Sequence, residues 1–205
     1  MNTISKLLIL GFPGFIFGFA VIYFGWCLLA RQIIRIEIKV LLYYMALAFP
    51  FCLILEVGFG NLHYLLFGKY LWEYQIFPVH DKLTSLLNFA IWPLYGLHFY
   101  LYDILEKNWK LAPVLKNVLY IIKLAVSGPL LEFILNAVCQ LAFNRYYFYY
   151  FPDDLLHYTS IQVVPYYFIA SYGFALLIKY LGKFSGKTYL PFIAYITGLV
   201  FLFSG

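Results

Sequence analysis

Runs of about 20 apolar residues recur along this chain of 205 residues, and a helix needs this length to cross a bilayer. No other feature limits the fold as strongly. Charged residues make up 11% of the chain, whereas a soluble domain carries about 25%. The sequence therefore predicts an all-α, polytopic protein of the cell membrane, with a single transmembrane domain over 1–205. The six expected spans are 7–30, 40–67, 83–105, 117–142, 159–180 and 189–203.

Basic residues are unevenly divided between the two sides of the predicted membrane. Four lie on the side that carries two aromatic loops, 68–82 and 143–158, and nine lie in the loops after the first, third and fifth spans. The positive-inside rule then places both termini and both aromatic loops outside. The net charge of +5 reports this topology, so nucleic acid is not an expected partner. The nine basic residues are Arg31, Arg35, Lys39, Lys107, Lys110, Lys116, Lys179, Lys183 and Lys187.

The stretch 54–105 is repeated at 130–180. Glu56 and Glu132 are related by an offset of 76 in the numbering, and the same offset joins Tyr74 to Tyr150. An even number of spans separates the two copies, so they have the same orientation in the membrane. This predicts a parallel repeat with a pseudo-two-fold axis along the membrane normal. Further matching pairs, at offsets of 74, 75 and 77, are Pro78/Pro152, Thr84/Thr159 and Gly96/Gly173.

Glu56 and Glu132 are the strongest candidates for function. A carboxylate inside a span costs about 2.5 kcal/mol or more, so it usually faces a bundle interior or a cavity. Helical spacing places further residues on the same faces. In the first copy these are Gly60 and His63, and in the second Asn136 and Cys139.

Facing segments are expected to complete a central polar cavity. The candidate solute-binding residues there are Asn88, Trp92 and Tyr95, with Trp72 and Tyr74 at the outer entrance. A structural interpretation stays open, in which each glutamate clamps a neighbouring helix or the backbone freed by a proline. Additional residues that can face this cavity are Ser85, Gln162, Tyr166 and Tyr172.

The outer loops carry the remaining ionisable groups, which lie just before Thr84 and Thr159. We expect these threonines to be helix N-caps, with the nearby acids interacting with the helix dipole. Two histidines and two aspartates also suit zinc, manganese or iron, but their spacing is not diagnostic, so neither a metal nor a cofactor is predicted. The three cysteines form no CxxC pair. The loop residues considered are His80, Asp81, Asp154 and His157.

The segment 66–74, followed by Pro78, Thr84-Ser85 and 92–96, resembles a small bacterial family of ABC-transporter-permease-like membrane proteins. The family pattern is an intramembrane Glu, a Trp-x-Tyr loop and a span with Trp-x-x-x-Gly. The resemblance implies a transport-related role. The repeat also resembles, faintly, the two-repeat carotenoid (lycopene) cyclases, although their Pro-Leu-Glu-Glu motif is absent here. The residues that match the family pattern are Glu56, Trp72, Tyr74, Trp92 and Gly96.

Three functions fit these observations. The first is binding or transport of a small or lipophilic solute through a cavity between the repeats. The second is an accessory or assembly role in a larger membrane complex, and the third is an intramembrane enzyme acting on a lipid or isoprenoid. Expected partners are membrane lipids and either a membrane-protein partner or a second copy of the chain. The sequence contains no P-loop, so ATP hydrolysis by that motif is excluded.

Overall fold

The computed structural model describes residues 3–106, 112–181 and 189–205. It is mostly helical and contains six helices over these residues, four of them long and apolar enough to cross a membrane. These four apolar stretches are Gly11–Ala30, Ile38–Phe67, Val114–Phe143 and Ile161–Leu181. The structure thus supports a membrane protein, as the apolar runs predicted. The helices are α1 (Thr3–Ala30), α2 (Ile38–Phe67), α3 (Asn88–Glu106), α4 (Pro113–Phe143), α5 (Val164–Leu181) and α6 (Tyr189–Phe203).

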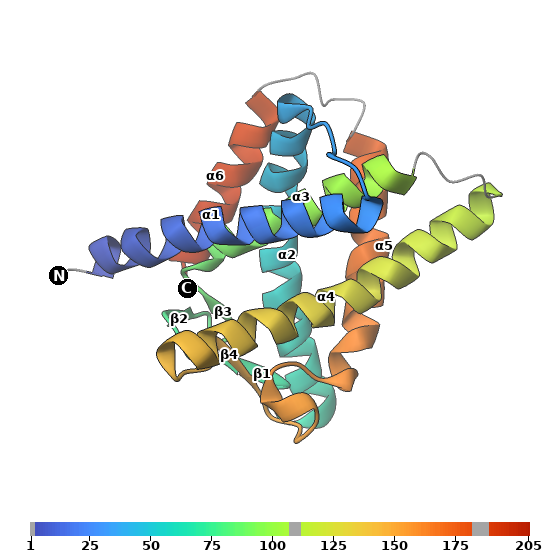
Figure 1. Ribbon diagram of the computed structural model, residues 1–205. Helices are drawn as coiled ribbons and strands as arrows, with labels where there is room; N and C mark the ends of the chain where they lie inside the picture. The colour runs from blue at the N-terminus through green and yellow to red at the C-terminus, as the bar shows by residue number, and fades with distance from the viewer. Residues whose placement is uncertain (1–2, 107–111, 182–188) are drawn as a thin grey trace.

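Two of the expected spans are not among these four apolar stretches. The helix α3 has 19 residues and is largely buried, because α1 and α2 pack along it. The helix α6 has 15 residues and packs on α2. Figure 1 shows α2, α5 and α6 upright, with α1, α3 and α4 crossing them. The other large helix contact joins α4 to α5.

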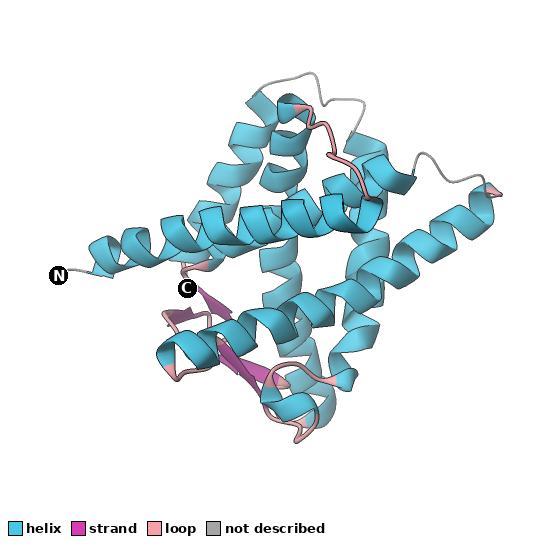
Figure 2. Cartoon of the chain, in the orientation of Figure 1, coloured by secondary structure: helices cyan, strands magenta, loops and turns pink. Residues whose placement is uncertain are grey.

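The aromatic loops contain short strands, where the sequence predicted only loops. The strands lie beside the C-terminal ends of α2 and α4 (Figure 2). The strand β2 of the first loop pairs with β3, which lies at the start of the expected third span, and between the loops β1 pairs antiparallel with β4. Two short 3₁₀ helices, η1 and η2, precede α5. The strands and 3₁₀ helices are β1 (Trp72–Tyr74), β2 (Pro78–Val79), β3 (Thr84–Ser85), β4 (Phe148–Tyr150), η1 (Leu155–His157) and η2 (Ile161–Val163).

The helices α2 and α4 end in the same way, at positions that correspond in the two halves of the chain. Gly68 and Asn144 both adopt the left-handed conformation, with φ of 71° and 51°. Each donates its backbone N–H to the carbonyl four residues earlier, which belongs to Tyr64 or Gln140. This αL cap ends a helix and redirects the chain. Here it leads the chain from each long helix into β1 or β4.

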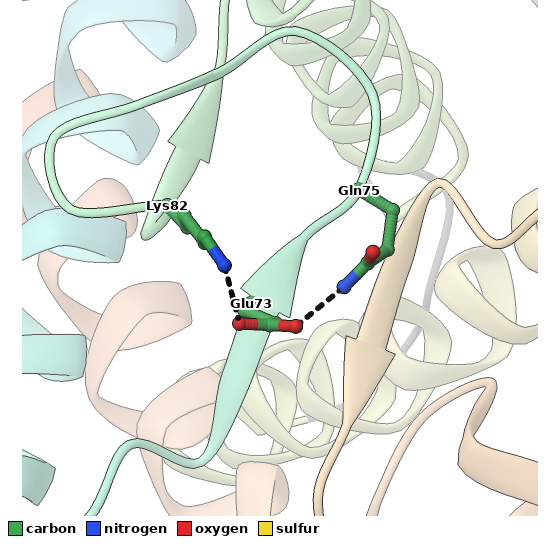
Figure 3. Close-up of polar contacts among 3 residues, drawn as sticks. All are labelled: Glu73, Gln75 and Lys82. Atoms are coloured by element: carbon green, nitrogen blue, oxygen red, sulfur yellow. Dashed lines mark hydrogen bonds and ion pairs between the residues drawn. The ribbon is translucent and has the colours of Figure 1, made fainter.

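The β1–β4 ladder is centred on the pair Glu73 and Tyr149, which are related by the same offset as the two glutamates. Alternation along a strand sends these two side chains to one face of the ladder and their neighbours to the other. Figure 3 shows Glu73 beside Lys82 and Gln75; its carboxylate lies 3.4 Å from Lys82 Nζ and accepts a 2.7 Å hydrogen bond from Gln75. The opposite face is buried, and it carries Trp72, Tyr74, Phe148 and Tyr150.

A close crossing of α2 and α3 fixes the position of the site. An added Cβ at Gly96 would lie 2.6 Å from the Tyr44 carbonyl oxygen and 2.7 Å from the Met45 nitrogen. Only glycine permits this approach, because any side chain would meet the backbone of α2. The crossing holds Trp92, one turn earlier on α3, toward α2.

Candidate functional site

Glu56, in the middle of α2, accepts hydrogen bonds from three side chains in other parts of the chain. The Tyr74 hydroxyl of β1 donates to its Oε1. Asn88 Nδ2 and Trp92 Nε1, both on α3, donate to its Oε2 over 3.1 Å and 3.2 Å. Asn88 Nδ2 and Trp92 Nε1 can only donate, so Oε2 serves as the acceptor for both.

Glu132, on α4, is bound in a parallel way by three hydroxyls. Tyr150 of β4 donates to the carboxylate, lying 3.0 Å from Oε1 and 2.9 Å from Oε2. Thr159 donates to Oε2 over 2.9 Å, and Tyr167 of α5 donates to Oε1 over 2.8 Å. All three donors are neutral.

Two of the three partners of each carboxylate occupy corresponding positions in the chain. Tyr74 and Tyr150 are related by an offset of 76, as are the two glutamates themselves. Trp92 and Tyr167 are related by an offset of 75, and they fill the same role with an indole N–H and a phenol. Each acid thus accepts from one strand tyrosine and from one aromatic side chain of the helix that follows.

The hydroxyls of Tyr74 and Tyr150 stay protonated and therefore remain hydrogen-bond donors. Burial, followed by the nearby Glu56 carboxylate, raises the pKa of Tyr74 well above its ordinary value. Burial and then Glu132 raise the pKa of Tyr150 in the same direction. Both phenols are thus protonated throughout the physiological pH range, and each keeps a proton for its carboxylate.

A second layer orients Asn88. The Tyr147 hydroxyl donates to Asn88 Oδ1 over 2.7 Å, which turns the Nδ2 group toward Glu56 and Thr84. Tyr147 precedes β4, whereas Asn88 begins α3. The first half of the chain therefore depends on the second for the geometry of its own acid.

Both carboxylates line one pocket of about 70 Å³. One ordered water needs about 10–15 Å³ of such volume, so the pocket holds several waters or a small ligand group. Its wall comes from α2, α3, α4, α5, β1 and β4, and it is mostly aromatic. The aromatic lining residues are Phe51, Phe59, Trp72, Tyr74, Trp92, Tyr95, Phe99, Phe148, Tyr150, Tyr166 and Tyr167.

Most of the site residues expected from the sequence lie at this pocket. Asn88 contacts Glu56 from behind the lining. The other expected residues that line the pocket are Glu56, Glu132, Trp72, Tyr74, Trp92 and Tyr95.

His63 and Asn136 lie outside the pocket lining. His63 Nδ1 hydrogen-bonds with the Tyr166 hydroxyl over 2.9 Å. Asn136 is fully buried and binds the backbone of the second aromatic loop. Its amide donates to the carbonyls of Phe148 and Tyr158, and its Oδ1 accepts from two backbone N–H groups. Asn136 thus holds β4 in place and does not present a polar group to the pocket.

The threonines expected as N-caps have a different role. Thr159 donates to Glu132, and Thr84 accepts from Asn88. Ser160 is the N-cap of η2 and accepts from the Gln162 N–H. Ser85 lies in β3 and accepts from the Leu87 N–H, before α3 begins at Asn88. The N-cap expectation for Thr84 and Thr159 was therefore wrong.

Sequence reasoning missed Thr159, Tyr150 and Tyr167 as partners of Glu132. The offsets of 75 and 76 to Thr84, Tyr74 and Trp92 were the signal that could have found them. The loop histidines and aspartates were the other ligand candidates. Within the described residues, no group of three His, Cys, Asp or Glu side chains is placed to hold a metal ion.

Each glutamate clamps neighbouring elements, as one part of the structural interpretation expected, and the hydrogen bonds described here do not involve backbone freed by a proline. The hydrogen bonds described for both carboxylates come from side chains of neighbouring elements.

Neither a protein-family model nor a curated protein nor a solved structure matches this chain. The site's own geometry is consequently the basis for any functional argument.

Proposed function

We propose that this protein binds a small or lipophilic solute in the pocket shared by Glu56 and Glu132, and moves it within the cell membrane. One observation carries the proposal: the carboxylates of Glu132, which is buried, and Glu56, which is partly buried, line the same aromatic pocket. Buried acids are costly in a membrane and usually mark a solute or ion pathway. Pockets with aromatic walls and a few convergent polar groups are the usual form of a small-molecule site.

A parallel internal repeat is part of this proposal, with six spans and both termini outside. Its support is the set of corresponding features at offsets of 75 or 76: the αL caps, the acid partners and the central pair of the β1–β4 ladder. Antiparallel pairing of two equivalent strands about equivalent residues is what a local two-fold axis produces. The pocket would then lie close to the axis, between the two acids.

The resemblance to ABC-transporter-permease-like membrane proteins adds weight to a transport role. Because the sequence carries no P-loop, energy for uphill movement would come from a partner protein or an ion gradient. Membrane lipids and a membrane-protein partner or second copy remain the proposed partners.

An intramembrane enzyme is the second candidate, and a hydroxyl chain at the pocket favours it. The Tyr95 and Tyr167 hydroxyls lie 3.4 Å apart, and Tyr167 donates to Glu132 over 2.8 Å. Such a chain can pass a proton between a bound lipid or isoprenoid and the carboxylate. A chemically altered lipid in cells that express the protein, and its absence with Glu132→Gln, would favour this candidate over transport.

The proposed function is tested by identifying what the pocket retains. We would purify the wild type, the double variant Glu56→Gln/Glu132→Gln and the control Glu73→Gln, and analyse their bound small molecules by mass spectrometry. The expected result is a solute that is retained by the wild type and the control and is lost from the double variant. Identical sets of bound molecules in all three proteins would contradict the proposal.

A second variant separates loss of binding from loss of folding. Ala170 lines the pocket from α5, and its methyl side chain carries no polar group. Ala170→Leu adds apolar volume to the pocket and removes no polar contact, so it should exclude the solute and still give a monodisperse protein by size-exclusion chromatography. If Ala170→Leu and the double variant both keep the solute, the solute lies elsewhere.

A further inference from the structure

We propose that the solute is a substituted ammonium cation, with the charge on a nitrogen that is covered by alkyl groups. This inference rests on the proposed function and specifies the chemical class of the ligand. It follows from three properties of the pocket: the sign of its charge, the occupied state of its carboxylate oxygens and its aromatic wall.

The charge in the pocket is one-sided. Two carboxylates line it, and no Lys, Arg or His belongs to the lining that the structure describes. A buried charge is stable only when it is paired. The donors around Glu56 and Glu132 are neutral, so they orient the carboxylates without supplying a positive charge. A singly charged cation in the pocket would balance one ionised carboxylate, with the second acid protonated.

The carboxylate oxygens have few acceptor positions left for a ligand. A carboxylate offers about four lone-pair positions. Glu132 already makes four contacts with three hydroxyls, and Glu56 accepts from three donors. A metal ion or a primary ammonium needs direct oxygen ligands. An alkylated ammonium needs only the electrostatic field, which these carboxylates still provide.

The aromatic wall of the pocket also favours binding of an alkylated ammonium. Trp92 and Tyr95 meet edge to face with ring centroids 4.9 Å apart, and Trp72 and Tyr150 lie 6.0 Å apart. All four rings line the pocket. Aromatic faces attract alkylammonium groups through cation–π interactions, and do so best when water is excluded. A pocket of about 70 Å³ suits a head group of trimethylammonium size better than a large aromatic cation.

A matched pair of probes tests the charge requirement directly. Choline and 3,3-dimethylbutan-1-ol have nearly the same shape, but only choline carries the charged nitrogen. We would titrate each by calorimetry into protein in nanodiscs that contain no choline lipids, with Ala170→Leu as the blank for nonspecific uptake. Choline should bind at least tenfold more tightly than the alcohol. Glu56→Gln and Glu132→Gln should each weaken choline at least tenfold and leave the alcohol unchanged, and Glu73→Gln should change neither.

The outcomes separate this inference from the proposed function. If the alcohol binds as tightly as choline, or if neither probe binds although the purified wild type retains a solute, the cation class is wrong and the solute-binding role survives. If no solute is retained and no probe binds, both proposals fail. A third probe, glycerophosphocholine, identifies the source of a cationic ligand. Binding of choline alone indicates a free cation, and binding of both indicates a lipid head group.

Discussion

Tyr74 and Tyr150 each donate to a glutamate that precedes them by 18 residues. In each half of the molecule this contact joins a strand, which carries the tyrosine, to the long helix that carries the acid. Both phenols are neutral donors, since burial and the adjacent carboxylate raise the pKa of each. A hydrogen bond to a charged group contributes about 1.5–3 kcal/mol.

Tyr150→Phe should therefore lower the free energy of unfolding by about 1.5–3 kcal/mol, because Glu132 loses one of its three donors. The control is Tyr149→Phe, whose side chain points to the other face of β4. Unfolding in detergent, followed by intrinsic fluorescence, measures both. Equal destabilisation by the two variants would contradict the account of Tyr150.

For single residues, the sequence was informative about the two acids and less informative about the side chains that donate hydrogen bonds to them. Glu56 and Glu132 could be found because a carboxylate within an apolar run is rare. Hydroxyl donors such as Thr159 and Tyr167 could not be chosen by type, because the chain contains 21 tyrosines. His63 shares a helical face with Glu56, yet its contact is Tyr166 outside the acid's own network.

Among the elements, the helices were predictable and the strands were not. A span leaves a signal of about 20 apolar residues in the sequence. The strands β1 and β4 have three residues each, and each pairs with a strand in the other half of the chain. Three residues are too few to show an alternating pattern, so pairing across that distance leaves no local signal. The helices α3 and α5 begin at Asn88 and Val164, later than the apolar runs suggested, because β3 and η2 occupy the first residues of those runs.

The β1–β4 pairing predicts a specific cross-link. Glu73 and Tyr149 are direct partners, and antiparallel partners have Cα atoms about 4.5–5.5 Å apart, within the range of a disulfide. With the three native cysteines replaced by alanine, Glu73→Cys/Tyr149→Cys should form an intramolecular disulfide on mild oxidation. Glu73→Cys/Arg145→Cys, four residues out of register, should not. Mass spectrometry of peptides distinguishes them, and equal cross-linking of both pairs would show that the register is wrong.

The α2–α3 crossing predicts opposite effects for two helical glycines. Gly96→Ala should destabilise the protein by at least about 1–3 kcal/mol, because its Cβ would press on the backbone of Tyr44 and Met45. Gly58→Ala, on α2, has nothing within 4 Å of the added carbon and should be neutral or stabilise by about 0.5–1 kcal/mol. Thermal unfolding in detergent measures both, and a neutral Gly96→Ala would argue against the close crossing.

For the whole molecule, the proposed orientation places the two aromatic loops outside and the basic loops inside. Cysteines introduced at Asp153 and at Arg31, in a background without native cysteines, test this. A membrane-impermeant thiol reagent should label Asp153→Cys in intact cells, because its side chain is 96% exposed. It should label Arg31→Cys only after the membrane is permeabilised. The reverse pattern would invert the topology and place the pocket's loop wall on the inner side.

The central claim is that Glu56 and Glu132 serve one ligand site. An experimental structure of the wild type in a lipid environment tests this most directly. We expect both carboxylates to face a single pocket that holds non-protein density between the aromatic rings of α2, α3 and α5, and we expect Glu56→Gln/Glu132→Gln to lose that density. Two glutamates that point into separate, dry helix contacts would contradict the claim, and both acids would then be structural.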